Sequence, residues 1–423
     1  MTTTAPADPR ARLQRRVVTT LIGSQILGGM SLTAGVAVGP LLAERLSGSA
    51  TWAGLGGTFQ VLGSALLAIP IAAVCAARGR RPGLVLGYAA AVIGALGTIA
   101  SAVWGSFPLF LVSAVLFGGA TASNSTTRYA AADLALPERR ARDLSVVVWA
   151  TTIGSVAGPN LTGPAAPVAR ALGIPSLAGA YVFSVVGLFC AIAVLLLLLR
   201  PDPLLESRRL AAAATDTAEE PAERSVLRGL TMAARIPQAR LGLLTLALGH
   251  GVMVSVMVMT PLHMAHGQAS LELIGFVISV HVLGMFAFSP LTGLAVDRFG
   301  GRAIALVGSM ILSSAALLAS TAPTGHSNSL LAGLFLLGLG WSCTFVSGSS
   351  LLTGALTPAQ RPAAQGAADV LTGLSAALGG AVGGVIVAEA SYHVLALAAL
   401  GFAVAVGLVA ALTPTAARER LLA

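Results

Sequence analysis

The chain has 423 residues, of which 56% are hydrophobic and only 10% are charged, and its formal net charge is +9. Because so little polar surface is left to cover a globule of this size, the composition excludes a soluble protein and predicts an integral membrane protein. All 25 basic residues are arginine.

Apolar runs of about 20 residues, the length of a helix that crosses ~30 Å of hydrocarbon, recur along the chain. We place twelve transmembrane helices at 17–43, 50–77, 83–104, 106–132, 144–168, 177–199, 241–263, 270–295, 303–322, 328–354, 366–388 and 391–413. The predicted fold is all-α, with six-helix bundles at 1–199 and 241–423. A charged cytoplasmic linker, 200–240, joins them and is expected to be partly helical or disordered.

The arginines alternate between the loops, which fixes the orientation. The basic segments contain Arg10, Arg12, Arg15, Arg16, Arg78, Arg80, Arg81, Arg139, Arg140 and Arg142, whereas only Arg45 and Arg170 fall in the opposite loops. The positive-inside rule therefore puts both termini in the cytoplasm, and we predict a multi-pass protein of a bacterial cytoplasmic membrane. The charge is attributed to topology and to attraction for anionic lipid, and no nucleic-acid partner is predicted.

Two features of the first half could take part in a conformational change: an arginine in the fourth span and a glycine-proline pattern in the fifth. Arg128 lies toward the cytoplasmic end of the fourth span, where it serves either an inner-gate charge network or contact with an anionic substrate. The fifth span contains Gly154, Gly158 and Pro159. Small residues let helices approach closely and proline loosens the backbone, so this pattern fits either a moving interface or simple tight packing.

Soft metal ligands are found on the seventh and eighth spans at one-turn spacing. Met253 and Met257 share one helix face, as do His281 and Met285, and Met253 and His281 fall near mid-bilayer depth. Three thioethers and an imidazole suit Cu(I), so copper is predicted as a transported substrate; no resident cofactor is predicted. Further donors for reception or relay are His250, His263, Met264 and His266.

Other interpretations of these residues remain open. Methionine commonly fills gaps in helical cores, and an intramembrane histidine is often a proton relay or a hydrogen-bonded structural group. The three cysteines lie in separate spans and indicate neither a disulfide nor a thiolate cluster.

The loop after the eighth span carries the pattern by which the chain resembles a known family. Residues 293–302 read Gly-Leu-Ala-Val-Asp-Arg-Phe-Gly-Gly-Arg, which is similar to the G-x-x-x-D-R-x-G-x-R loop of the major facilitator superfamily. Its key residues are Gly293, Asp297, Arg298, Gly300 and Arg302. The first-half equivalent keeps Gly79, Arg80 and Arg81 but has Ala76 in place of the aspartate, so we expect a weaker latch there.

The resemblance implies twelve spans and alternating access, and the fifth-span glycines resemble the glycine-proline motif of antiporters in the same superfamily. The order Met-xxx-Met in span seven and His-xxx-Met in span eight also resembles the CcoA-like copper importers. That resemblance implies copper import with Met253, Met257, His281 and Met285 as ligands.

The leading prediction is a secondary-active importer of copper. A proton-coupled exporter of drugs or small amphipathic metabolites is the alternative, opposed by the lack of Asp or Glu near the centre of any predicted span. The span-end carboxylates are Glu44, Asp133, Glu272, Asp369 and Glu389. A copper-binding membrane sensor is a third hypothesis. An enzyme is not expected, because no catalytic set or phosphate loop is found.

Overall fold

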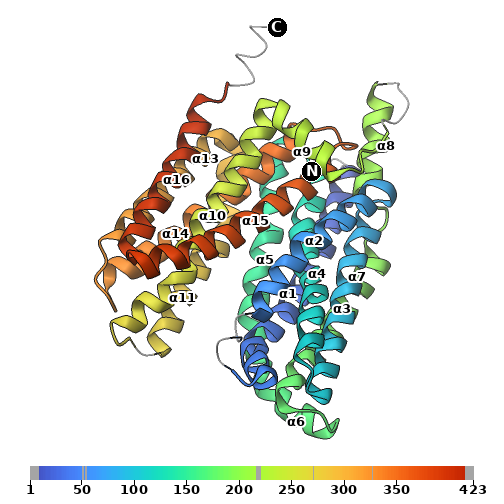
Figure 1. Ribbon diagram of the computed structural model, residues 1–423. Helices are drawn as coiled ribbons and strands as arrows, with labels where there is room; N and C mark the ends of the chain where they lie inside the picture. Colours follow the sequence, from blue (N-terminus) through green and yellow to red (C-terminus); the bar gives the residue numbers. More distant parts are fainter. Residues whose placement is uncertain are drawn as a thin grey trace, which may run out of the picture. The chain divides into compact units, whose positions relative to one another are not determined.

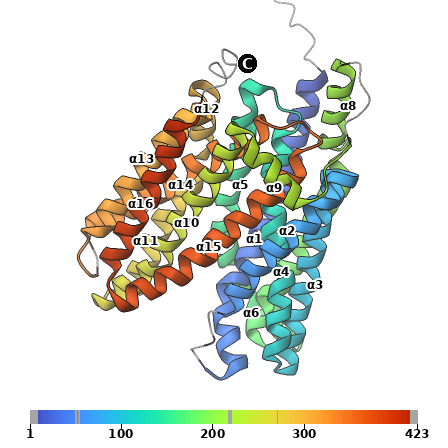
Figure 2. The ribbon, with the colours of Figure 1, turned by 45° about the horizontal axis from the view of Figure 1, so that its top comes forward.

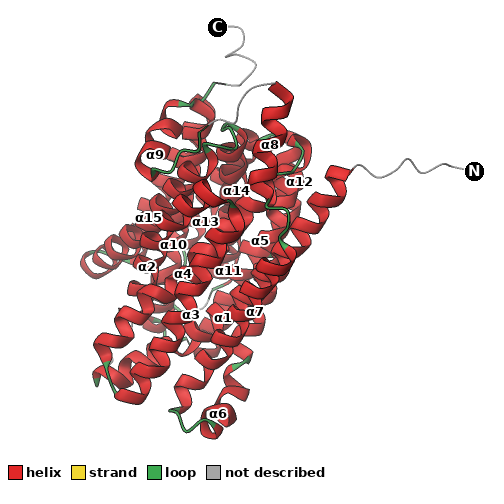
Figure 3. Cartoon of the chain, turned by 90° about the vertical axis from the view of Figure 1, so that its right-hand side faces the viewer, coloured by secondary structure: helices red, strands yellow, loops and turns green. Residues whose placement is uncertain are grey.

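The computed structural model describes residues 9–49, 52, 55–215, 221–269, 271–325 and 327–414. Within these residues every regular element is a helix (Figure 3). Eleven helices are long and apolar enough to cross a membrane, or 12 if Pro137–Gly158 and Gly163–Ala171, bent by 63°, form one span. The all-α transmembrane fold predicted from the sequence is confirmed, and its fifth span is bent just after the Gly-Pro pair.

The chain divides into two compact units by its internal contacts. Unit 1 comprises Met1–Leu136, Ile153–Val226 and Pro358–Asp369, and unit 2 comprises Pro137–Thr152, Leu227–Thr357 and Val370–Ala423. Each unit therefore includes a short stretch from the other half of the sequence. These stretches contain the first turns of α5 (Arg140–Asn160) and of α15 (Arg361–Glu389).

Unit 1 is built from helices of the first half of the chain. They are α1 (Pro9–Ser47), α2 (Leu55–Arg78), α3 (Arg80–Trp104), α4 (Phe107–Ala132), α6 (Thr162–Ala171), the 3₁₀ helix η3 (Ser176–Ala178), α7 (Gly179–Leu198) and α8 (Pro203–Thr215). α2 and α3 both pack on α4 (Figure 2), and α7 packs on α1 and α3. Four fully buried aromatic side chains, Tyr88, Phe110, Phe117 and Tyr129, fill its core.

Unit 2 is centred on α14. Its helices are η2 (Pro137–Arg139, 3₁₀), α9 (Val226–Arg235), α10 (Pro237–His266), α11 (Leu271–Phe286), α12 (Ser289–Phe299), α13 (Gly301–Ser320), α14 (Asn328–Gly354) and α16 (Tyr392–Leu412). α10, α11 and α13 all pack on α14, and α16 packs on α10 and α13 (Figure 1). In the predicted eighth span, residues 287–288 form a turn between α11 and α12, and Leu273–Phe299 together are long enough for one span.

Local sequence explains where several helices start and turn. Ser106, Ser327 and Ser391 each accept a hydrogen bond from the backbone N–H three residues later, and so cap α4, α14 and α16. Gly79 and Gly300 separate α2 from α3 and α12 from α13 at φ of 94° and 86°, a region that side-chain-bearing residues rarely adopt. The glycine shared by the two loop motifs is thus required at both turns.

The stretch predicted as a linker is mostly helical where it is described. α8 and α9 lie within residues 200–240, and α10 already begins at Pro237. The domain boundaries drawn at 199 and 241 stay a prediction, because the two units follow contacts and not the halves of the sequence.

Candidate functional site

In unit 2 the loop motif at residues 293–302 is hydrogen-bonded to the start of α5. Asp297 accepts hydrogen bonds from the backbone N–H groups of Ala141 (2.9 Å) and Arg142 (2.8 Å), which a helix cannot satisfy internally. Gly293 makes the approach feasible, because a Cβ there would stand 2.7 Å from both the Ala141 carbonyl oxygen and the Ser145 Cβ. We call Gly293, Asp297 and the first turn of α5 the Asp297 latch. It places a carboxylate on the positive end of a helix dipole.

The remaining residues of this motif serve the turn itself. Arg302 donates from Nε to the Ala410 carbonyl and from Nη2 to the Ala411 carbonyl, both at 2.7 Å, and so caps the end of α16. Arg298 is exposed and lies over the ring of Phe299. The motif therefore ties α12 to α5 through its aspartate and α13 to α16 through its last arginine.

In unit 1 the equivalent region is a buried ion cluster. Arg80 donates from Nε to Asp133 Oδ2 at 2.7 Å and from Nη2 to Gln365 Oε1 at 2.6 Å. Arg361, the first residue of α15, lies 3.6 Å from Asp133 Oδ1. We call Arg80, Asp133, Arg361 and Gln365 the Asp133 cluster. Arg80 is 1% and Asp133 3% exposed, so three charges from three helices are held away from solvent.

A second buried ion pair joins α4 to α15. Arg128 Nη2 donates to Asp369 Oδ1 at 3.0 Å and to the Tyr129 hydroxyl at 2.9 Å. α15 begins at Arg361, five residues before the predicted start, so Asp369 lies two turns inside the helix. A buried carboxylate is thus present inside α15, where the sequence analysis had placed it at a span end. Arg128 is part of a buried ion pair, and its role at an inner gate stays a prediction.

The linker helix α8 supplies contacts at the first-half loop motif, where Ala76 lacks a carboxylate. Arg208 Nη1 donates to the Ala76 carbonyl at 2.9 Å. Asp202 Oδ2 accepts from the N–H of Arg81 at 2.8 Å, while its Oδ1 accepts from the N–H of Leu204 at 3.1 Å. We call Asp202 and Arg208 the α8 clamp. It caps the end of α2 and the start of α3 with residues outside the motif.

The glycine face of the fifth span packs against α1. A Cβ on Gly154 would stand 2.8 Å from the Met30 nitrogen, and one on Gly158 would stand 2.6 Å from the Met30 oxygen. The Thr33 hydroxyl donates to the Gly154 carbonyl at 2.9 Å. The side chain of Pro159 lies outside the described part of the chain. The glycines are therefore needed for a close helix contact, and movement at this interface stays a prediction.

The four predicted copper ligands lie in or beside one apolar cluster of unit 2. Met253 and Met285 are buried within it, and Met257 packs against it. His281 is fully buried, and its Nδ1 lies 2.8 Å from the Leu334 carbonyl of α14. Since only a protonated nitrogen donates to a carbonyl, Nε2 carries the lone pair, and this buried atom has no hydrogen-bond partner. α10 and α11 each pack on α14.

The residues predicted for reception or relay are spread along α10. His250 accepts from Trp341, whereas His263 Nε2 lies 3.2 Å from the Pro323 carbonyl. The His263 ring stacks on Tyr392 with centroids 4.2 Å apart. Met264 is buried and His266 is exposed. Among the described residues no group of three or more His, Cys, Asp or Glu is arranged to hold a metal ion.

An aromatic cluster that the sequence did not reveal lies at mid-helix in unit 2. Trp341 Nε1 donates to His250 Nδ1 at 2.8 Å, and its ring stacks on Phe345 at 4.4 Å. Phe286, the last residue of α11, meets the Trp341 ring edge-on at 5.5 Å. We call His250, Phe286, Trp341 and Phe345 the aromatic cluster. The one available signal was the Trp341 to Phe345 spacing of four on a single helix face.

Comparisons with known proteins extend over nearly the whole chain. The model of the Major Facilitator Superfamily matches residues 21–268 and 241–422. The uncharacterized MFS-type transporter YddS of Bacillus subtilis (strain 168) is 37% identical over 392 residues, covering 92% of this chain and 89% of that protein. The riboflavin transporter RfnT of Brucella anthropi is 28% identical over 356 residues, covering 82% and 83%.

A solved structure shares the fold. The human organic anion transporter MFSD10 (TETRAN) superposes with a TM-score of 0.77 over 94% of this chain and 99% of its own. At 20% identity this likeness concerns the fold alone.

Proposed function

This chain belongs to the major facilitator superfamily, and we propose that it is a secondary-active transporter of a small organic solute that carries a planar ring. Alternating access requires contacts that are made in one state and broken in the other. The Asp297 latch and the Asp133 cluster fit this need. Each holds the first turns of one long helix by a few hydrogen bonds or ion pairs, which a change of state could break.

The aromatic cluster is the observation that carries the substrate class. His250 is the 14th residue of the 30 in α10, and Trp341 is the 14th of the 27 in α14, so both lie at mid-span. Phe286 is the last residue of α11 and lies near the middle of the span Leu273–Phe299, and binding sites of transporters tend to lie near the midplane. Trp341 is 3% exposed and holds Phe345 and His250 in place, whereas Phe345 and His250 are themselves partly exposed. Stacking on Phe345 would favour a flat ring, and His250 adds a polar group.

The relatives are consistent with this substrate class. RfnT is named for riboflavin, whose ring system is planar and heteroaromatic. Riboflavin is therefore the first solute to test, together with other ring-bearing metabolites and amphipathic drugs, in both directions of transport.

The test is flux of radiolabelled riboflavin and of a panel of aromatic solutes across proteoliposomes. We expect Trp341→Leu to reduce flux at least tenfold and Phe345→Leu to raise KM more than it lowers maximal rate. Trp104→Leu is the matched control, because that tryptophan is 74% exposed at the end of α3. Equal flux of a transported solute through wild type and Trp341→Leu would remove the aromatic cluster from the site.

Asp369 is the residue we propose for proton coupling. Its carboxylate is buried and paired with Arg128. Protonation would neutralise the carboxylate, break the ion pair and free the guanidinium of Arg128 to move. Asp369→Asn is expected to abolish accumulation driven by a proton gradient while solute exchange without a gradient continues. Loss of exchange together with accumulation would assign Asp369 a structural role instead.

Copper import is a second candidate, favoured by His281. A metal-bound histidine commonly donates its other N–H to a backbone carbonyl, as His281 does to Leu334, a residue of the apolar cluster that also contains Met253 and Met285. The relatives give this candidate no support, since none of the three is named for copper. A proton acceptor would need the same lone pair.

Copper uptake under reducing conditions separates the two candidates. Copper import predicts uptake that is lost in Met257→Ala and in His281→Ala at equal membrane abundance, with Met310→Ala, an exposed methionine of α13, as the control. No uptake above empty membranes would leave the organic solute as the working function.

A further inference from the structure

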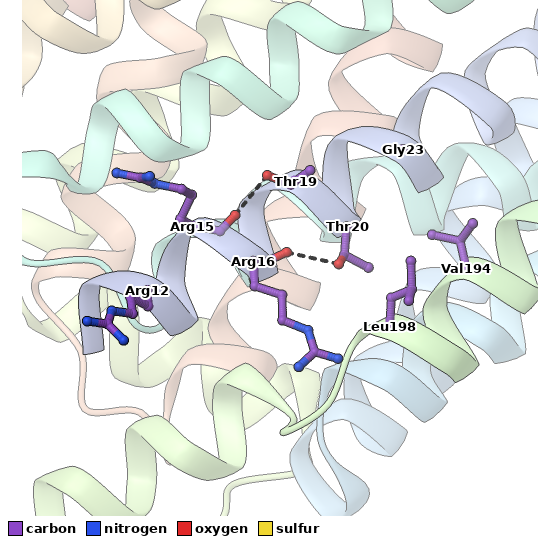
Figure 4. A pocket seen from close by; sticks show the side chains of 8 residues that line it. All are labelled: Arg12, Arg15, Arg16, Thr19, Thr20, Gly23, Val194 and Leu198. Atoms are coloured by element: carbon purple, nitrogen blue, oxygen red, sulfur yellow. Dashed lines mark hydrogen bonds between the residues drawn. The ribbon is translucent and has the colours of Figure 1, made fainter. Parts of the chain in front are cut away.

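We propose that the start of α1 and the end of α7 form a binding site for the headgroup of an anionic phospholipid. A recess of about 500 Å³ opens between these helices in unit 1. It is lined by Arg12, Arg15, Arg16, Thr19, Thr20, Gly23, Val194 and Leu198 (Figure 4). This site is separate from the latches and from the aromatic cluster.

The arginines of the recess occupy one face of α1. Gln14 lies on the opposite face, where its Nε2 donates to the Ala131 carbonyl of α4 at 2.7 Å. That contact fixes the rotation of the helix, so Arg12, Arg16 and the turn above them face away from α4. All three arginines border the recess, and Figure 4 shows their guanidinium groups spread around it, with that of Arg16 lying nearest to Leu198 of α7.

The charge of the recess calls for an anion. No acidic side chain lines it, and no described carboxylate pairs with Arg12, Arg15 or Arg16. The threonine hydroxyls cannot serve as the anion's donors, because Thr19 and Thr20 donate to the carbonyls of Arg15 and Arg16 at 2.9 Å. The guanidinium groups are therefore the donors that would bind the ligand. Their N–H groups lie in one plane and match the spacing of phosphate oxygens.

The other wall of the recess is apolar, and this selects a lipid over a soluble phosphate. Val194 and Leu198 come from the last turns of α7 and face Thr20 and Gly23 of α1 (Figure 4). Leu197 and Leu198 are 69% and 48% exposed, and Arg200 lies two residues beyond Leu198. A phosphate held by arginine beside an exposed leucine surface at a helix end matches the headgroup and first acyl carbons of a membrane lipid.

The experiment is native mass spectrometry of the detergent-purified full chain with phosphatidylglycerol, and with phosphatidylcholine as the zwitterionic reference. The triple variant R12Q/R15Q/R16Q is compared with R78Q/R209Q/R235Q, which removes the same charge from exposed arginines outside the recess. An arginine that lies against an anionic headgroup strengthens its binding by roughly fivefold, whereas an arginine outside the site does not contact the bound lipid. We expect at least tenfold weaker phosphatidylglycerol binding in the first variant and wild-type binding in the second.

A second variant protects the test against misfolding of the first. Gly23→Leu fills the recess without changing charge, since a Cβ there meets only Val194 Cγ1 at 3.9 Å. It is also expected to weaken phosphatidylglycerol binding. Unchanged binding in both variants would overturn the proposal, and so would equal binding of phosphatidylcholine. Full competition by millimolar inorganic phosphate or glycerol 3-phosphate would replace the lipid with a small phosphate ligand.

Discussion

The two loop motifs occupy equivalent places in the two halves of the chain, yet they fasten their target helices with different chemistry. The Asp297 latch uses one half-buried carboxylate on two backbone N–H groups of α5. The Asp133 cluster uses three buried charges and an amide to fasten the start of α15. The first contact depends on a helix end and one side chain, whereas the second depends on four side chains.

The difference shows how a missing motif residue is replaced. Ala76 is fully buried, and a carboxylate is instead supplied by Asp133 at the end of α4, while the α8 clamp caps the neighbouring helix ends. The glycine that allows close helix packing is also on the other helix of the pair. In unit 2 it is Gly293 of the motif-bearing helix α12, whereas in unit 1 it is Gly366 of the target helix α15, which lies against Ala72 of α2. The expectation of a weak first-half latch considered only the motif and not its surroundings.

The largest effect is expected from Asp133→Asn. Neutralising this residue leaves the charges of Arg80 and Arg361 buried without a counter-ion, which costs ~3–5 kcal/mol for a broken buried pair. We expect a clear drop in the unfolding temperature and faster amide hydrogen exchange in residues 361–369.

Glu206→Gln is the control for that variant, because its partner Arg209 is 79% exposed and the pair is 4.0 Å long. The expectation is that the Asp133 cluster contributes more to stability than the Asp297 latch. It is wrong if Asp133→Asn leaves the unfolding temperature and amide exchange at wild-type values while Asp297→Asn changes them.

The sequence was sufficient for the features that depend on local pattern. Hydrophobic length placed the spans, and the positive-φ glycines of both loops were named with Asp297. The pairing of Asp133 with Arg80 and with Arg361 could not be predicted, because these residues are distant in the sequence and meet only through packing. Trp341 and Phe345 were missed for a similar reason: their role depends on His250 and Phe286, which come from two other helices.

Asp297→Asn is expected to have an intermediate effect. The amide oxygen still accepts one N–H, but the second hydrogen bond and the negative charge at the helix end are lost, and a hydrogen bond to a charged group contributes ~1.5–3 kcal/mol. Amide exchange should rise in residues 140–145 and stay unchanged in residues 361–369. A rise in both segments would show that the two contacts act as one, which would break the comparison made above.

The smallest effect is expected from Asp202→Ala, which tests whether the linker helix takes over from the missing motif aspartate. The variant removes the acceptor for the N–H groups of Arg81 and Leu204, and loss of a helix cap costs ~0.5–2 kcal/mol. Exchange should rise at the starts of α3 and α8, while Asp202→Asn, which keeps an oxygen acceptor, should retain most of the protection. Restoring the motif carboxylate with Ala76→Asp is not expected to rescue the alanine variant, because the aspartate would enter a fully buried position beneath Arg208 and leave the N–H of Arg81 unpaired. Rescue by Ala76→Asp would instead show that the α8 clamp and the motif aspartate are interchangeable.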